Sequence, residues 1–91
     1  MAGICDGRVV IITGAGGGLG REYALAFAKE GASVVINDIN PAAAERTVGE
    51  IGAMGGKAIA NSNDITNHAD AGLIVKAAID AFGDLHVVVN N

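Results

Sequence analysis

The feature that most constrains the fold is a glycine-rich loop set between two strongly apolar runs. The runs Arg8–Thr13 and Ser33–Asp38 flank a segment with five glycines among residues 14–20, followed by a helical pattern. Val and Ile without polar alternation are typical of strands buried on both faces of a parallel sheet. Parallel strands need a helical crossover between them. We therefore expect a strand, a glycine loop, a helix and a second strand in this order.

The helix after the glycine loop is expected over Leu19–Glu30, with Gly31 as its stop. Leu19, Tyr23 and Phe27 recur at the spacing of one helix face, with Ala24 and Ala28 beside them, and we interpret this face as the one that packs on the sheet. Tyr23 is therefore expected to be a core residue.

The same alternation of strand and helix patterns continues along the rest of the chain, without a linker or a low-complexity segment. Connections of helical length predict parallel neighbours, hence an α/β fold of order β-α-β-α-β-α-β with helices on both faces of the sheet. The later elements are expected to be a helix from a cap at Asn40 and Pro41 to about Ile51, a strand over Lys57–Asn61, a helix from a cap at Thr66 or Asn67 through Phe82 to Gly83, and a strand over Leu85–Asn90.

Charge and composition exclude several classes of function. The net charge of −4, with six scattered Lys and Arg residues, argues against a nucleic-acid partner. No apolar stretch approaches the roughly 18 residues of a membrane span. The single cysteine, Cys5, excludes an intramolecular disulfide and lies where a frayed N-terminus is expected. A cytoplasmic location is predicted.

Glycine in the loop suits the approach of an anion to the backbone. A helix N-terminus presents unpaired N–H groups and the positive end of the helix dipole, which favour a phosphate. Gly14 is expected in a turn conformation that other residues avoid, and Gly20 at a close contact between helix and strand. The alternative is a flexible turn with close packing, which one or two glycines would satisfy.

Asp38 ends the second strand, 20 residues after Gly18. A carboxylate at this place can accept hydrogen bonds from both ribose hydroxyls of an adenosine, and it would repel a 2′-phosphate. Because the loop carries no basic residue before Arg21, NAD is favoured over NADP. The alternative is a solvated carboxylate without a ligand.

Three motifs together resemble the short-chain dehydrogenase/reductase family. TGAGGGLG at residues 13–20 matches its T-G-x-x-x-G-x-G motif, while NDI at 63–65 and NN at 90–91 resemble its Asp-apolar pair and the start of its N-N-A-G motif. The spacing is neither G-x-G-x-x-G nor a P-loop. The resemblance implies a Rossmann-type sheet of strand order 3-2-1-4, truncated after the fourth strand, with residues 1–91 as a partial dinucleotide-binding domain.

The resemblance also implies which residues hold the dinucleotide. The glycine loop would lie along the pyrophosphate and the nearby ribose, the strand-end carboxylate at the adenosine ribose, the Asp-apolar pair at the adenine, and the first asparagine of the NN pair beside the cofactor. In this order they are Gly14, Gly16, Gly17, Gly18 and Leu19, then Asp38, then Asp64 and Ile65, then Asn90.

Members of this family are oxidoreductases that move a hydride between a nicotinamide cofactor and a CH–OH group or carbonyl. In that family, a Tyr-x-x-x-Lys pair, a Ser and a further Asn lie beyond the N-N-A-G motif. The one tyrosine here, Tyr23, is followed four positions on by Phe27 rather than by a lysine. His68 and His86 fit no triad or metal pattern. No catalytic residue is therefore expected, and the 91-residue chain alone is predicted to be inactive. Within the family, the sequence looks most like the peroxisomal multifunctional dehydrogenases acting on 3-hydroxyacyl-CoA.

The sequence is also compatible with two alternatives to a dehydrogenase. The chain could serve as a non-catalytic nucleotide-binding or self-assembly module, or it could belong to another nucleotide user such as a methyltransferase. The NDI and NN matches disfavour the methyltransferase. If the fourth strand lies at the sheet edge, Val87–Val89 would form an open apolar edge, and self-association through it is expected.

Overall fold

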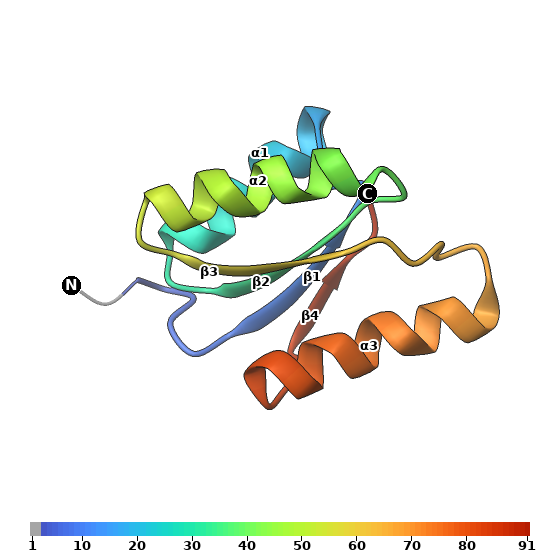
Figure 1. Ribbon diagram of the computed structural model, residues 1–91. Helices are drawn as coiled ribbons and strands as arrows, with labels where there is room; N and C mark the ends of the chain where they lie inside the picture. The colour runs from blue at the N-terminus through green and yellow to red at the C-terminus, as the bar shows by residue number, and fades with distance from the viewer. Residues whose placement is uncertain (1–2) are drawn as a thin grey trace.

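The computed structural model describes residues 3–91 and shows a four-stranded sheet with helices on both faces (Figure 1). The first two residues of the expected domain lie outside the described residues. The elements in chain order are β1 (Val9–Thr13), α1 (Gly18–Lys29), β2 (Ser33–Asn37), α2 (Pro41–Ala53), β3 (Lys57–Asn61), α3 (His68–Phe82) and β4 (Val87–Val89).

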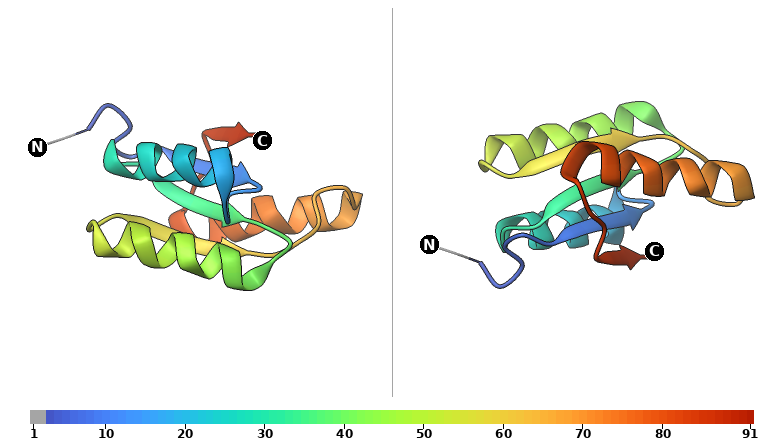
Figure 2. Two further views of the ribbon diagram at one scale, coloured as in Figure 1. Left: turned by 90° about the horizontal axis from the view of Figure 1, so that it is seen from above. Right: turned by 90° about the horizontal axis from the view of Figure 1, so that it is seen from below.

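The sheet has the order β3-β2-β1-β4, and every neighbouring pair is parallel. This confirms the α/β, Rossmann-type prediction together with its strand order. α1 and α2 lie on one face of the sheet and α3 lies on the other, as two further views show (Figure 2). Because all strands run the same way, their carboxyl ends meet at one edge of the sheet, where the loops that follow them gather.

The core consists of two clusters, one on each face of the sheet. Toward α1 and α2, the even-numbered residues of β1 and β2 pack on small helix residues and on Ile51. Toward α3, Val9, Ile11 and Val35 pack on Ile74 and Ala78. The alternation of strand side chains between the two faces explains why β1 and β2 read as continuous apolar runs.

The prediction for α1 was right about Ala24 and Ala28, which are buried, and about Phe27, which is partly buried against the core, but it was wrong about Leu19 and Tyr23. Leu19 is 59 % exposed and Tyr23 is 40 % exposed, so Tyr23 is not a core residue. The buried residues of α1 are Gly20, Ala24 and Ala28. Small residues allow the helix backbone to approach closely: a Cβ on Gly20 would lie 2.3 Å from the carbonyl oxygen of Gly14. This contact confirms the prediction that Gly20 permits close packing, and it leaves the larger side chains on the flank of the helix.

Two further expectations need correction near the chain ends. Cys5 does not lie in a frayed segment, since its backbone N–H donates to the carbonyl of Glu30 at 2.8 Å and its side chain packs on the core. β4 covers three residues rather than the predicted Leu85–Asn90, because its pairing with β1 begins at Val87.

At the start of α3, Asn67 rather than Thr66 is the cap, and its side chain accepts two backbone N–H bonds.

Candidate functional site

The glycine loop joins the end of β1 to α1 in the conformation that its glycines require. Gly14 and Gly18 have φ values of +63° and +55°, the left-handed region that favours glycine, and Gly14 thus confirms its predicted turn role. Gly17 is the N-cap of α1 and has no side chain to cap the helix. A Cβ on Gly17 would meet nothing within 4 Å. The N-terminus of α1 is therefore open to an approaching anion.

Asp38, directly after β2, turns its carboxylate toward this loop. Its Oδ2 accepts from the backbone N–H of Gly16 at 2.9 Å, and its Oδ1 accepts from the N–H of Asn40 at 2.9 Å. A Cβ on Gly16 would lie 2.7 Å from Oδ2 and 2.6 Å from the Cβ of Ala43. Gly16 is thus also required by the packing of the loop against Asp38 and α2, a reason that the sequence did not reveal.

Asp64 and Ile65 lie in the loop between β3 and α3. The Asp64 Oδ1 accepts from the hydroxyl of Thr66 at 2.7 Å and from the Thr66 N–H at 2.9 Å. The hydroxyl bond, reinforced by the backbone bond, lowers the pKa of Asp64, so the exposed carboxylate stays ionised and remains an acceptor. Ile65 is 38 % exposed beside it.

Asn90, directly after β4, lies next to Thr13 at the end of β1. The Thr13 hydroxyl is 3.5 Å from the Asn90 Oδ1, and it accepts the backbone N–H of Asn91 at 3.0 Å. Asn90 and Ile65 contribute to the lining of one cavity of about 260 Å³ on the α3 side of the sheet. The structure therefore brings the residues after all four parallel strands to one edge of the sheet.

An asparagine network at the same edge was missed by the sequence analysis. Asn37, Asn61 and Asn63 are joined by side-chain hydrogen bonds of 2.9–3.0 Å between the ends of β2 and β3. The available signal was an asparagine at the end of two neighbouring apolar strands. It was not used because its meaning depends on the register between those strands.

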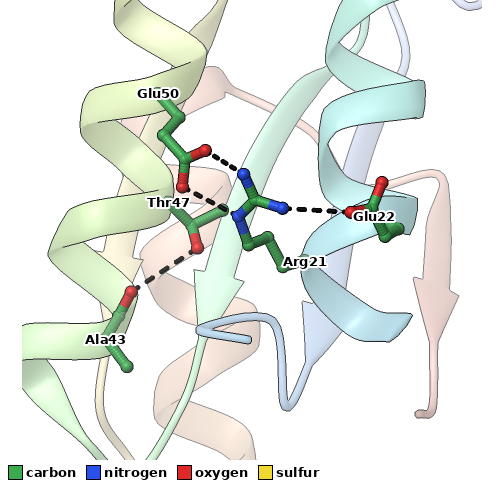
Figure 3. A network of polar contacts seen from close by, with 5 residues as sticks. All are labelled: Arg21, Glu22, Ala43, Thr47 and Glu50. Carbon is green, nitrogen blue, oxygen red and sulfur yellow. Dashed lines mark hydrogen bonds and ion pairs between the residues drawn. The ribbon is translucent and has the colours of Figure 1, made fainter. Parts of the chain in front are cut away.

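Arg21, the first basic residue after the loop, is held by acidic residues of α1 and α2 (Figure 3). Its guanidinium makes a two-pronged contact with Glu50, with Nε 2.9 Å from Oε1, and a second contact with Glu22 at 3.0 Å. The hydrogen bonds to Glu50 raise the pKa of Arg21, and those from Arg21 lower the pKa of Glu50. Its charge is thus partnered between the two helices (Figure 3).

His86 serves the fold. The Nδ1 of His86 accepts the backbone N–H of Val9 at 3.0 Å, which fixes the start of the β1–β4 pairing. Within residues 3–91, no three His, Cys, Asp or Glu side chains are grouped as a metal site. No helix in this described part is long and apolar enough to cross a membrane.

Comparisons with known proteins agree with this arrangement. A short-chain type dehydrogenase/reductase of Mycobacterium tuberculosis is 48 % identical over 100 residues, covering 100 % of this chain and 35 % of that protein. The peroxisomal multifunctional enzyme type 2 of Mus musculus is 51 % identical over 96 residues, covering 94 % of this chain and 12 % of that protein. The chain thus spans about a third or less of the length of these relatives.

A solved structure, 7α-hydroxysteroid dehydrogenase complexed with NADH and 7-oxo glycochenodeoxycholic acid, has the same fold. The TM-score is 0.92 at 46 % sequence identity, and the match covers 94 % of this chain and 34 % of that chain. The sequence profile of the short chain dehydrogenase family matches residues 8–91. The matched residues include the glycine loop, the carboxylate that follows β2 and the asparagine after β4, and this chain belongs to the short chain dehydrogenase family.

Proposed function

We propose that residues 3–91 form the dinucleotide-binding part of an NAD-dependent oxidoreductase that moves a hydride to or from a nicotinamide. The observation that carries this proposal is the open N-terminus of α1 beside the Asp38 carboxylate, which is held 2.9 Å from the Gly16 N–H. Backbone N–H groups suit the pyrophosphate, and the carboxylate suits the ribose hydroxyls. The proposed contacts are Gly14, Gly16, Gly17, Gly18, Leu19, Asp38, Asp64, Ile65 and Asn90.

A preference for NAD over NADP is part of the proposal. A 2′-phosphate on the adenosine ribose would lie beside the Asp38 carboxylate, and two negative groups in close contact repel each other. The guanidinium of Arg21 would not offset this repulsion, because Glu50 and Glu22 already partner it. Support for a nicotinamide cofactor also comes from the related 7α-hydroxysteroid dehydrogenase, whose structure is a complex with NADH.

Catalysis of hydride transfer is not proposed for the 91 residues alone. The chain has no Tyr-x-x-x-Lys pair, and Tyr23 lies on α1 with Phe27 one turn on. The proposed role of these residues is to bind and orient the dinucleotide. Relatives of similar identity are named for different substrates or reactions, so no substrate is proposed. Some are named as peroxisomal, and the cytoplasmic location stays a prediction.

The experiment that tests this proposal is a calorimetric titration of the chain with NAD, repeated with NADP. Saturable one-site binding with the tighter dissociation constant for NAD is expected. A folded chain, verified by circular dichroism, that binds neither dinucleotide would refute the proposed site. Equal affinity for both would leave dinucleotide binding in place and remove the proposed discrimination by Asp38.

A second, independent proposal concerns association of the chain with another copy of itself. Among the strands of the described residues 3–91, β4 pairs only with β1, and Val87 and Val88 are 38 % and 56 % exposed. An exposed apolar strand edge is a template for strand pairing, and a second copy of this chain offers an identical edge. Sedimentation of the wild-type chain should show dimers or larger species, and Val88→Lys should shift them toward monomer. A wild-type chain that stays monomeric at high concentration would contradict this proposal.

A further inference from the structure

Asn37 is buried at the carboxyl end of the central strand β2, beside the last residues of β1 and β3. It is the last residue of β2, and its register partners are Thr13 of β1 and Asn61 of β3. Its exposed fraction is 3 %, although its side chain is polar. A buried amide is costly unless its hydrogen-bonding groups are satisfied, so the partners of this side chain reveal what it stabilises.

The side-chain amide of Asn37 reaches across to the loop after β3. Its Nδ2 donates to the Oδ1 of Asn61 at 3.0 Å and to the backbone carbonyl of Asn63 at 3.0 Å. A third contact of this nitrogen, to the backbone carbonyl of Asn61, is longer at 3.4 Å, and the two hydrogens of an amide nitrogen suffice for the two shorter bonds. Asn61 and Asn63 also bond to each other through their side chains at 2.9 Å. Asn63 directly precedes Asp64 and Ile65, so the network fixes the residue at which the segment proposed to contact adenine begins.

The backbone around Asn37 holds the glycine loop at the same time. The carbonyl of Asn37 accepts the N–H of Ala15 at 3.0 Å, and the next residue, Asp38, holds the N–H of Gly16 through its carboxylate. The N–H of Asp38 in turn donates to the carbonyl of Asn61 at 3.0 Å. Residues 37 and 38 are therefore bonded both to the loop proposed for the pyrophosphate and to the loop proposed for the adenine.

We propose that Asn37 is a positioning residue that holds these two loops in one fixed arrangement, so that an adenine is read by its hydrogen-bonding edge. This inference rests on the proposed function. Adenine has an amino donor at N6 and an acceptor at N1, which complement the carboxylate of Asp64 and the backbone N–H of Ile65. Serine has one donor and a shorter reach, and aspartate has no donor when ionised, so neither replaces both bonds of Asn37.

The test compares two ligands that differ only in the base, NAD and nicotinamide hypoxanthine dinucleotide. Hypoxanthine has a carbonyl in place of the amino group and an N–H at N1, so its edge has the opposite polarity. The wild-type chain should bind NAD more tightly. Asn37→Ser should lower the ratio of the two dissociation constants by about two- to tenfold, the range for one hydrogen bond. A general loss of folded protein would weaken both ligands equally and leave this ratio unchanged.

Asn67→Ser is the matched control, because it makes the same chemical change nearby. Asn67 caps α3 through its side-chain oxygen, and serine retains a capping oxygen. The ratio for Asn67→Ser should equal that of the wild type.

If Asn37→Ser does not fold, hydrogen exchange of the Asn37 side-chain amide in the wild-type chain provides the test. Slow exchange of both hydrogens is expected, and exchange at the rate of a free amide would overturn the inference.

The possible failures separate the inference from the function on which it rests. A wild-type chain that binds neither ligand refutes the proposed function and this inference with it. A wild-type chain that binds both ligands equally retains a dinucleotide site but does not discriminate adenine from hypoxanthine. This result also refutes the inference about Asn37. A wild-type chain that discriminates, with the same ratio in an Asn37→Ser variant shown to be folded by circular dichroism, refutes the inference alone.

Discussion

The two faces of the sheet differ in how completely helices cover them. Toward α1 and α2, the cluster includes ten buried residues, and several of them are fully inaccessible. Toward α3, the cluster has five buried residues, and only Ile74 and Ala78 of α3 are among them. On the α3 side, exposed apolar side chains remain on the helix and on β4, namely Leu73, Val75, Ile79 and Val88.

This difference separates the part of the molecule that holds the glycine loop from the part that offers apolar surface. The glycine loop leads into α1, whose small residues pack on β1 and β2, so the loop rests on the well-packed face. β4 and the outer side of α3 have apolar groups that would be buried only against another surface. We infer that the rigidity of the site depends on the first region and that association depends on the second.

The largest expected effect is a contrast between the core of β2 and the edge strand. Ile36 is fully buried, and Ile36→Ala should lower the free energy of unfolding by about 2–5 kcal/mol, the usual cost of such a cavity. Val88→Ala, on a residue 56 % exposed, should lower it by less than about 1 kcal/mol. Urea denaturation measures both, with Ile36→Val as a milder variant should Ile36→Ala not fold. Similar costs at the two positions would contradict the comparison.

Reversal of the charge at residue 38 should come next in size. Asp38→Arg removes an acceptor proposed for the ribose hydroxyls, so NAD binding should weaken by about ten- to a hundredfold, the range for a hydrogen bond to a charged group. The relative affinity for NADP should rise, because arginine can pair with a 2′-phosphate. Titrations of wild-type and variant chains with both dinucleotides provide the measurement. An unchanged preference would remove Asp38 from the proposed site.

Two helical glycines should respond to alanine with opposite signs. A Cβ on Gly20 would overlap the Gly14 carbonyl, so Gly20→Ala should destabilise the chain by about 1–3 kcal/mol, typical of overpacking. Gly49, exposed in α2, has open space around its Cβ position, so Gly49→Ala should stabilise it by about 0.4–1 kcal/mol. Thermal unfolding of both variants would measure the difference. A neutral Gly20→Ala would show that α1 can move away from the loop without cost.

The smallest effect is expected at the contact between α1 and α2. Arg21 lowers the pKa of Glu50, so Glu50 contributes stability above its ordinary pKa of 4.5, and this contribution is lost as the pH falls through the lowered value. Both side chains are about a third exposed, so the effect on the melting temperature should be small. Glu50→Gln should lower the melting temperature slightly at pH 7 and reduce the loss of stability below pH 4.5. Asp80→Asn, at the more exposed Lys76–Asp80 pair of α3, is the control and should change it less. A larger change for Asp80→Asn would contradict the ranking of the two faces.

Much of the fold could be predicted because its signals are local in the chain. The apolar runs of β1 and β2, the caps at Asn40 and Asn67 and the stop at Gly83 each depend on a few adjacent residues, and the structure confirms them. The packed face of α1 could not be predicted in the same way. Tyr23 and Ala24 are neighbours in the sequence, and periodicity placed both on one face without showing that only the smaller residue would be buried.

By itself, the sequence determined the order of the elements, the position of the glycine loop and the carboxylate that follows β2. Only the tertiary structure decided which groups meet there: Gly16 with Asp38 and Ala43, and Asn37 with Asn61 and Asn63. Arg21 and Glu50, likewise, are 29 residues apart and meet only because α1 and α2 pack side by side. Backbone preferences and caps act within a turn or two of chain, whereas these contacts depend on strand register and on how closely a helix approaches the sheet.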